Sequence, residues 1–131
     1  MNKYITLDEY KIAKGVDLSL ELKDDDNASN KVNRFIKDIT DWCCNYLITT
    51  YAVNELNEDL HDFNKLSEFR QKRFRKGVIE QIEYVLSEGL VDLQTGINET
   101  TGQILDYSHI VLGHSAYREF FLGAFCNIGR E

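Results

Sequence analysis

The sequence predicts a mainly α-helical fold: a small bundle of two long antiparallel helices, with one short helix before them and another after. The 131 residues contain no proline, the residue that most strongly interrupts a helix. Apolar residues recur at steps of three and four over residues 28–51 and again over residues 67–88, which is the spacing of a helix with one buried face. A chain of this length suits a single core.

A short first helix is predicted from Leu7 to Lys14. Thr6 before it and Glu9 three residues later match the capping box, in which each side chain bonds to the backbone N–H of the other residue. Gly15 is a natural stop, because glycine readily adopts the left-handed conformation that ends many helices. The residues that follow alternate between apolar and polar, which favours a short extended stretch over Val16, Leu18, Leu20 and Leu22.

The first long helix is predicted from Ala28 to about Tyr51, with Asp26 or Asn27 as its cap. The run of Asp24, Asp25 and Asp26 before it is typical of a solvated loop and cap region. A calcium-binding EF-hand would need a glycine and a terminal glutamate that are missing here.

The core is expected between the two long helices. Trp42 carries the largest apolar side chain on the apolar face of the first, so we expect it at the centre of the core. The side chains predicted to pack with it are Phe35, Ile39, Val78 and Ile82.

The second long helix is predicted from about Ser67 to Glu88, ending at Gly89, after a connection at about residues 54–64. Its charge order is unusual, because cations crowd its first half and anions its second. That order opposes the helix dipole by about 0.3–1 kcal/mol for each exposed charge in a terminal turn. Arg75 also falls inside the apolar arc of this helix.

Two interpretations of this charge order remain open. The charges could form a solvated face that is stabilised by i,i+4 pairs such as Lys76–Glu80. Alternatively they form a basic patch for an acidic partner, and the predicted subunit-interface residues are then Arg70, Arg73 and Lys76.

The composition changes over residues 90–114, where glycines separate short apolar groups. This predicts a loop or β-hairpin insertion, with a turn over Asn98–Gly102. Ser115 is then expected to cap a last helix whose members include Ala116, Phe120, Leu122 and Phe125. The predicted organisation is a helical domain over residues 1–114 and a C-terminal helix and tail over residues 115–131.

The charge and composition exclude several classes of protein. The chain has 15 Lys and Arg against 22 Asp and Glu, a formal charge of −7, which argues against a protein that wraps DNA or lies on a membrane surface. No apolar run approaches the roughly 20 residues of a membrane span, and the N-terminus lacks the apolar region of a signal peptide. We therefore expect synthesis in the cytoplasm and no contact with a membrane.

The residues that could carry chemistry form no catalytic constellation in the sequence. His61, His109 and His114 fall in predicted loops without metal-ligand spacing, and Ser115 beside His114 has the wrong geometry for a triad. The three cysteines are Cys43, Cys44 and Cys126, and Cys43 is expected to be a buried apolar residue. The sequence predicts a protein that is not an enzyme and holds no metal or cofactor.

Three stretches carry a resemblance to a known family: "YITLDEYK" at residues 4–11, "QIEYVLSEG" at residues 81–89 and "LGAFCNIGRE" at residues 122–131. Together with the order of the helices, they resemble the head–tail connector family of long-tailed bacteriophages, also called adaptor or head-completion proteins. The three stretches cover about a quarter of the chain. The tripled Asp and the paired cysteines depart from that family.

The resemblance implies a structural virion protein, made in the host bacterial cytoplasm and located in the neck of the particle. Its subunits would form a ring, typically of twelve, that extends the DNA channel below the portal protein and meets a downstream neck or tail-completion protein. Viral DNA would pass without specific binding, because a negative surface repels phosphates. The aromatic tail would grip the portal or a neighbour, and residues 123–131 would be dispensable for folding. The resemblance assigns that grip to Phe120, Phe121, Phe125, Ile128 and Arg130.

A second function class stays open. The chain could instead be a small acidic helical protein, encoded by a phage, that binds a regulatory or host target. That alternative predicts a monomer or dimer whose C-terminal helix folds onto its own bundle.

Overall fold

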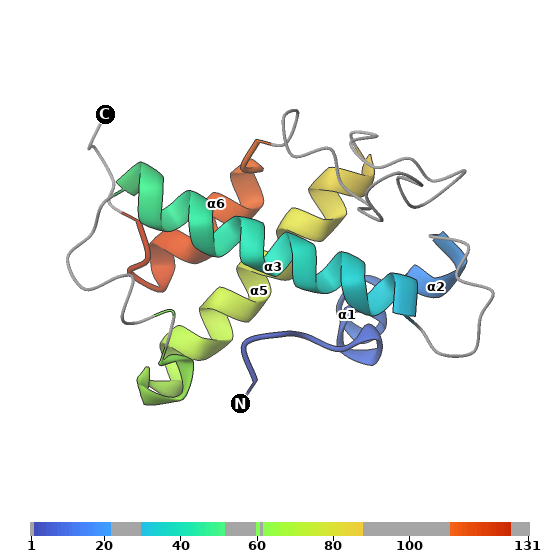
Figure 1. Cartoon of the computed structure of the whole chain (residues 1–131), viewed down its shortest axis with the longest axis horizontal. Helices are drawn as coiled ribbons and strands as arrows, with labels where there is room; N and C mark the ends of the chain where they lie inside the picture. Colours follow the sequence, from blue (N-terminus) through green and yellow to red (C-terminus); the bar gives the residue numbers. More distant parts are fainter. Residues whose placement is uncertain (1, 22–29, 52–59, 61, 88–110, 127–131) are drawn as a thin grey trace.

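The computed structural model describes residues 2–21, 30–51, 60, 62–87 and 111–126, and within them the protein is mainly helical, as predicted (Figure 1). The described ranges contain no strand. None of their helices is both long and apolar enough to cross a membrane. In chain order the elements are α1 (Leu7–Lys14), α2 (Leu18–Glu21), α3 (Asn30–Tyr51), the short 3₁₀ helix η1 (Phe63–Lys65), α5 (Glu68–Ser87) and α6 (His114–Leu122).

The two long helices form the frame of the molecule. In Figure 1, α3 and α5 run in broadly opposite directions and cross, α1 and α2 lie near the start of α3, and α6 lies beside α5. The predicted bounds of α3 and α5 agree with the structure within the described residues. The predicted caps at Asp26 and Asn27 and most of the 90–114 insertion lie outside them.

Helix α1 has the predicted bounds and the predicted capping box. The Thr6 hydroxyl accepts from the Glu9 backbone N–H at 3.1 Å, and the Glu9 carboxylate accepts from the Thr6 backbone N–H at 3.0 Å. Gly15 ends the helix with φ of 71°, the left-handed conformation that favours glycine there. The local sequence therefore sets where this helix begins and ends.

The extended stretch predicted after Gly15 is wrong, because Leu18–Glu21 forms the single helical turn α2. The Asp17 carboxylate accepts from the Ser19 backbone N–H at 3.0 Å and from the Ser19 hydroxyl at 2.6 Å. This capping of free N–H groups favours a helical turn. Leu18 is buried while Leu20 is 76% exposed, so the apolar alternation did not reflect a strand with one buried face.

The predicted packing of α3 against α5 is confirmed for four of its five residues, since Phe35, Ile39, Val78 and Ile82 are all fully buried. The expectation that Trp42 is the centre of the core is wrong. Trp42 is only partly buried and stacks on Tyr46, with 5.0 Å between ring centroids. An indole one turn from a second aromatic ring on the same helix gains contact area at the edge of the core.

The aromatic centre of the core is instead Phe74 of α5. Its ring centroid lies 5.5 Å from those of Phe63, Phe120 and Phe125. Edge-to-face and tilted pairs at this distance are favourable beyond their buried area. Residues from η1, α5 and the C-terminal segment therefore meet at one side chain.

Arg75 is the charged residue that the sequence placed inside the apolar arc of α5, and the structure explains it. Its guanidinium donates to the backbone carbonyls of Asn2 and Tyr4 and pairs with the Glu9 carboxylate. Arg75 is 9% exposed, so these partners compensate the burial of its charge. The residue ties the N-terminal segment and α1 to α5.

Helix α6 starts and ends differently from the prediction. Its N-cap is Gly113 rather than Ser115, and Gly123 ends it, so Phe125 follows the helix instead of belonging to it. The Gly113 N–H donates to Gln81 Oε1 at 2.9 Å, and the Gln81 amide donates to the Val111 carbonyl at 2.9 Å. A buried side chain of α5 thus satisfies the backbone at the start of α6.

Candidate binding face on α5 and α6

All described residues that the sequence singled out for binding lie on α5, on α6 or just after α6. Arg70 of α5 holds the end of α6: its Nε donates to the Gly123 carbonyl at 2.8 Å and its Nη2 approaches the Ala124 carbonyl at 3.3 Å. Its guanidinium also lies 4.7 Å from the centroid of the Phe125 ring. A cation is favourable there, because the last carbonyls of a helix carry partial negative charge.

Arg73 joins the two helices one turn further along α5. Its Nη1 donates to the Glu119 carboxylate at 2.8 Å, and both side chains are mostly buried. The same guanidinium lies 5.2 Å from the centroid of the Phe69 ring. Arg73 is therefore committed to a contact inside this chain.

Of the three predicted interface residues, Lys76 is the exposed one, while Arg70 and Arg73 have the internal contacts just described. Glu80 is paired with a residue other than Lys76, its suggested i,i+4 partner. Its carboxylate instead accepts from Lys14 Nζ at 2.8 Å. The unusual charge order of α5 is thus largely explained by docking of α1 and α6.

The tail residues expected to grip a partner are divided by the structure. Phe120 and Phe125 are fully buried in the core of this chain, so neither is available to a partner in this conformation. Phe121 is partly buried and stacks on Tyr117, with 6.4 Å between centroids. Ile128 and Arg130 lie outside the described residues.

An exposed surface remains around the Arg73–Glu119 pair, and we call it the α5–α6 face. Phe69, 55% exposed, lies one helical turn before Arg73, and Leu122, 43% exposed, lies three residues after Glu119. Because Arg73 and Glu119 are paired, these two apolar side chains flank the same ion pair. The exposed cations of these two helices are Lys72, Lys76 and Arg118.

Lys72 forms an ion pair within α5 on this face. Its Nζ lies 3.2 Å from the Glu68 carboxylate, one turn earlier on α5, and both side chains are exposed. Such an exposed i,i+4 pair contributes about 0.3–0.5 kcal/mol to stability, so Lys72 can readily exchange Glu68 for another acidic partner.

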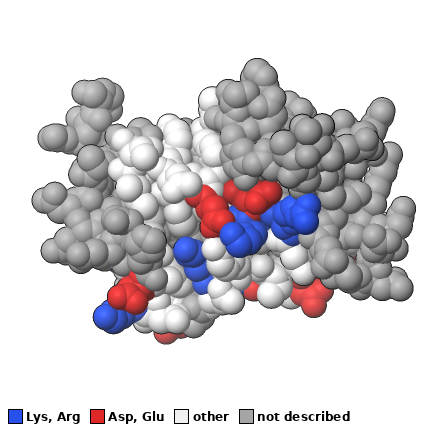
Figure 2. Space-filling view, in the orientation of Figure 1, with Lys and Arg blue, Asp and Glu red and all other residues white. Residues whose placement is uncertain are grey.

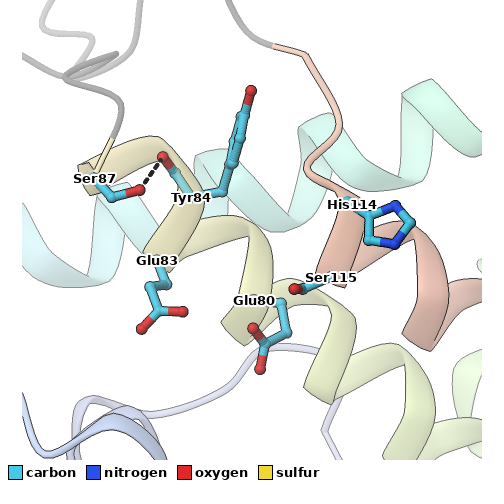
Figure 3. A pocket seen from close by; sticks show the side chains of 6 residues that line it. All are labelled: Glu80, Glu83, Tyr84, Ser87, His114 and Ser115. Atoms are coloured by element: carbon cyan, nitrogen blue, oxygen red, sulfur yellow. Dashed lines mark hydrogen bonds between the residues drawn. The ribbon is translucent and has the colours of Figure 1, made fainter.

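A hollow of about 400 Å³ lies at the other end of α5, where α6 begins. Figure 3 shows Glu80, Glu83, Tyr84 and Ser87 approaching from α5, and His114 and Ser115 from the start of α6. Its acidic edge is engaged by Lys14, whose Nζ lies 2.8 Å from Glu80 and 3.1 Å from Glu83. Burial alone would lower the pKa of Lys14, but its hydrogen bonds to these two carboxylates raise it overall.

The arrangement in this hollow gives no catalytic pair. In Figure 3 the hydroxyl of Ser115 points toward Glu80, whereas the ring of His114 points away from Ser115. A nucleophile needs a base within hydrogen-bond reach. The sequence did not indicate the hollow, because its walls come from positions more than 25 residues apart in the chain.

The cysteines offer no reactive thiol. Cys43, Cys44 and Cys126 are buried and unpaired, as expected for Cys43. Burial raises the pKa of Cys44 and of Cys126 to about 11, and that of Cys43 well above its usual value. The thiolate is the reactive form. Among the described residues no group of three or more His, Cys, Asp and Glu could hold a metal ion.

The net charge is divided unevenly along the chain. The described residues hold 13 Lys and Arg against 11 Asp and Glu, a net charge of +2, and the remaining residues hold 2 against 11, a net charge of −9. Figure 2 shows side chains of both signs mixed over the middle of α3, where Lys37 pairs with Asp41 at 2.7 Å. The net negative charge of the sequence therefore comes from residues other than the described ones.

Comparisons with protein-family models, with curated proteins and with solved structures returned no match to this chain.

Proposed function

We propose that this chain is a structural binding protein without catalytic activity, and that it serves as a ring-forming subunit of a phage head–tail connector. In this role it would sit between the portal protein and a downstream neck or tail-completion protein, and viral DNA would pass along the ring. The observation that carries the proposal is the α5–α6 face, where Phe69 and Leu122 are exposed on helices that also carry the exposed cations Lys72, Lys76 and Arg118. Such a face suits a contact that is repeated from subunit to subunit.

The order of helices also supports this proposal. The described parts of all three stretches that resemble the connector family lie in the bundle: residues 4–11 include the start of α1, residues 81–87 form the end of α5, and residues 122–126 include the last residue of α6 and the buried Phe125. Glu9 in the first stretch pairs with Arg75, so this stretch is docked against α5. Residues that carry the resemblance therefore also contribute to the stability of the fold.

One observation favours the second candidate function, a small helical protein that binds a regulatory or host target. That candidate predicted a C-terminal helix folded onto its own bundle. Phe120 of α6 lies fully buried against Phe74 of α5. A connector subunit that grips the portal would then have to use the exposed part of α5 and α6 or residues beyond 126.

The native mass of the purified chain, alone and with an isolated portal ring, separates the two candidates. The connector proposal expects a ring-sized species or a stable complex with the portal, in a fixed ratio of subunits. A chain that stays monomeric or dimeric and leaves the portal unbound contradicts the connector proposal and supports the second candidate.

A further inference from the structure

One side of α5 carries charged and apolar side chains that reach solvent. Phe69, Lys72 and Lys76 are exposed in the first half of the helix, and Glu83 is exposed in the second half. Together with the partly exposed Glu80, these residues follow one another at steps of three and four, so they share one side of the helix. We call these five residues the α5 strip. The strip is apolar and basic at its start and acidic at its end, about 21 Å further along.

The charge order of the α5 strip is the reverse of the order that stabilises a helix. Acidic residues near the start of a helix and basic residues near its end interact favourably with the helix dipole, and helices commonly carry that ordinary order. A helix of ordinary order that runs in the same direction as α5 would therefore place its acids against the cations of the strip and its bases against the acids. If it ran in the opposite direction, like charges would meet along the whole strip.

Helix α1 shows that α5 already binds one helix of ordinary order in this way. The first turn of α1 holds the acidic residue Glu9, and its last turn holds the basic residue Lys14. Glu9 pairs with Arg75, whereas Lys14 pairs further along α5, with Glu80 at 2.8 Å and with Glu83 at 3.1 Å. The start and end of α1 thus contact α5 in the same order along both chains.

The basic half of the α5 strip stays available to a partner. Lys76 forms no ion pair with another described residue, and Lys72 pairs with Glu68 at 3.2 Å in an exposed contact of the kind that is weak. Phe69 is 55% exposed at the start of the strip, and Leu122 of α6 is 43% exposed. A partner helix would therefore need an apolar side chain against these two residues and carboxylates one and two turns further on.

The acidic half of the strip can accept a further cation. Lys14 supplies one positive charge to Glu80 and Glu83, so the two carboxylates keep a formal charge of −1 between them. The hollow of about 400 Å³ lies beside them, and Figure 3 shows both carboxylates on the same side of α5. A hollow of this size suits one long basic side chain, because pockets for small ligands begin at about 300 Å³.

We propose that the α5 strip, together with Leu122 of α6, binds an amphipathic helix of a different protein that runs in the same direction as α5. The acidic first half of that helix would lie over Phe69 and the two lysines, and a basic side chain from its second half would enter the hollow. This inference rests on the proposed binding function and names the chemistry of the partner. A second copy of the chain is a poorer fit, because Glu9, Glu80 and Glu119 are already engaged within the chain.

The probe is a displayed library of helices of about 20 residues, which span about 30 Å, held on a rigid helical scaffold with their outward positions randomised. The library is selected on the full chain. We expect the binders to carry acids in their first half, bases in their second half and an apolar side chain on the same face. Binders without this charge order, or a library in which no helix binds the wild type, would overturn the proposal.

The affinity of one selected helix for variants of the chain then locates the contact. Lys76→Glu should weaken binding by about tenfold or more, because like charges then meet. Lys11→Glu, the same charge change at an exposed position on α1, should leave binding within about twofold of wild type. Phe69→Ser should weaken binding, whereas Ile12→Ser should not, although Ile12 is 85% exposed. Circular dichroism checks that all four variants stay folded, and an equal loss within either pair contradicts the proposal.

The direction of the bound helix is tested with a spin label at either of its ends. A label at the first residue should broaden the amide resonances around Phe69, and a label at the last residue should broaden those around Glu83. The reverse pattern is incompatible with the proposal. Sedimentation of the chain alone tests the other occupants: self-association that Phe69→Ser abolishes would assign the strip to a second copy, and binding of duplex DNA that Lys76→Glu abolishes would assign it to nucleic acid.

The same variants mixed with a portal ring keep the two proposals apart. If the selected helices bind as expected and the wild type leaves the portal unbound, the connector function fails and the present inference stands. If no library helix binds, and the wild type, Lys76→Glu and Phe69→Ser all bind the portal alike, the inference fails and the connector function stands.

Discussion

The ring of Phe120 in α6 lies directly against Gly77 of α5, so that a Cβ at position 77 would come within 2.3 Å of Phe120 Cε1. Substituting Gly77→Ala should therefore destabilise the protein, although alanine favours helix by about 1 kcal/mol. Overpacking a filled core costs about 1–3 kcal/mol, and Phe120 is held in place by Phe74. The expected result is a lower midpoint of denaturant unfolding.

The double variant Gly77→Ala/Phe120→Leu is the matched test, because a smaller side chain relieves the overlap. We expect its midpoint to exceed the one that additive effects of the two single changes would give. Simple additivity would show that Phe120 does not contact position 77.

A second prediction concerns the C-terminal segment. Phe125→Ala should destabilise the protein by about 3–5 kcal/mol, as for other fully buried aromatic residues. Deleting residues 123–131 should abolish cooperative unfolding, because it removes Phe125 and the carbonyls that Arg70 binds. The control ends the chain after Cys126 and keeps every contact described above. A stable, helical protein lacking residues 123–131 would instead favour the tail expected from the resemblance.

A third prediction compares two aromatic residues of the core. Phe74→Ala should destabilise the protein by about 3–5 kcal/mol, because three other rings lose their partner. Trp42→Ala should have a clearly smaller effect, since the indole is only partly buried at the edge of the core. Urea unfolding of both variants gives the comparison. A larger effect at Trp42 would show that Trp42, and not Phe74, is at the centre of the core.

The fourth prediction is a pH dependence that comes from Glu9. Burial alone would raise the pKa of this carboxyl, but its hydrogen bond to Arg75, the positive charge of Arg75 and bonds from Thr6 lower it overall. A carboxyl whose folded pKa is depressed contributes stability above its unfolded pKa of about 4.3, and that contribution is lost as pH falls through the folded pKa. The wild type should therefore lose stability below about pH 4.5.

Glu9→Gln should be less stable than wild type at pH 7, and the difference should shrink as the pH falls toward 3. Denaturant midpoints at several pH values measure this convergence. Asp8→Asn, which changes an exposed acidic neighbour on the same helix, is the control and should differ from wild type at pH 7 by less than Glu9→Gln does. A constant difference between Glu9→Gln and wild type would show that Glu9 does not pair with Arg75 as a carboxylate.

Local patterns in the sequence were sufficient for the elements whose signals lie within a few residues of one another. The capping box of Thr6 and Glu9, the glycine stop and the apolar faces of α3 and α5 gave correct helices. The short helix α2 was missed because apolar alternation over so few residues does not distinguish one turn of helix from a short strand. There the Asp17 cap decided between them.

The candidate site was harder to predict, because its features depend on which distant residues meet. The cations of α5 were noticed for their position along the helix, yet their partners Glu9, Glu119 and Gly123 are 46 to 66 residues away. No periodicity reveals such pairs. The exposure of Phe69 and Leu122 likewise depends on how α5 and α6 pack against each other, so the α5–α6 face could be found only from the structure.

Helix α5 holds both the N-terminal segment and α6, and this has a consequence for the order of folding. The tethers from Arg75 to Asn2 and from Lys14 to Glu80 close loops of 73 and 66 residues, whereas α1 and α6 are too short to be stable alone. Closing a long loop loses chain entropy before any contact compensates for it. The contacts of α6 with α5 close shorter loops, such as the 32 residues between Gln81 and Gly113. We therefore expect α5 to pair with α3 and α6 in the folding nucleus, and α1 to become ordered on the downhill side of the transition state, where substitutions accelerate unfolding and leave the refolding rate nearly unchanged.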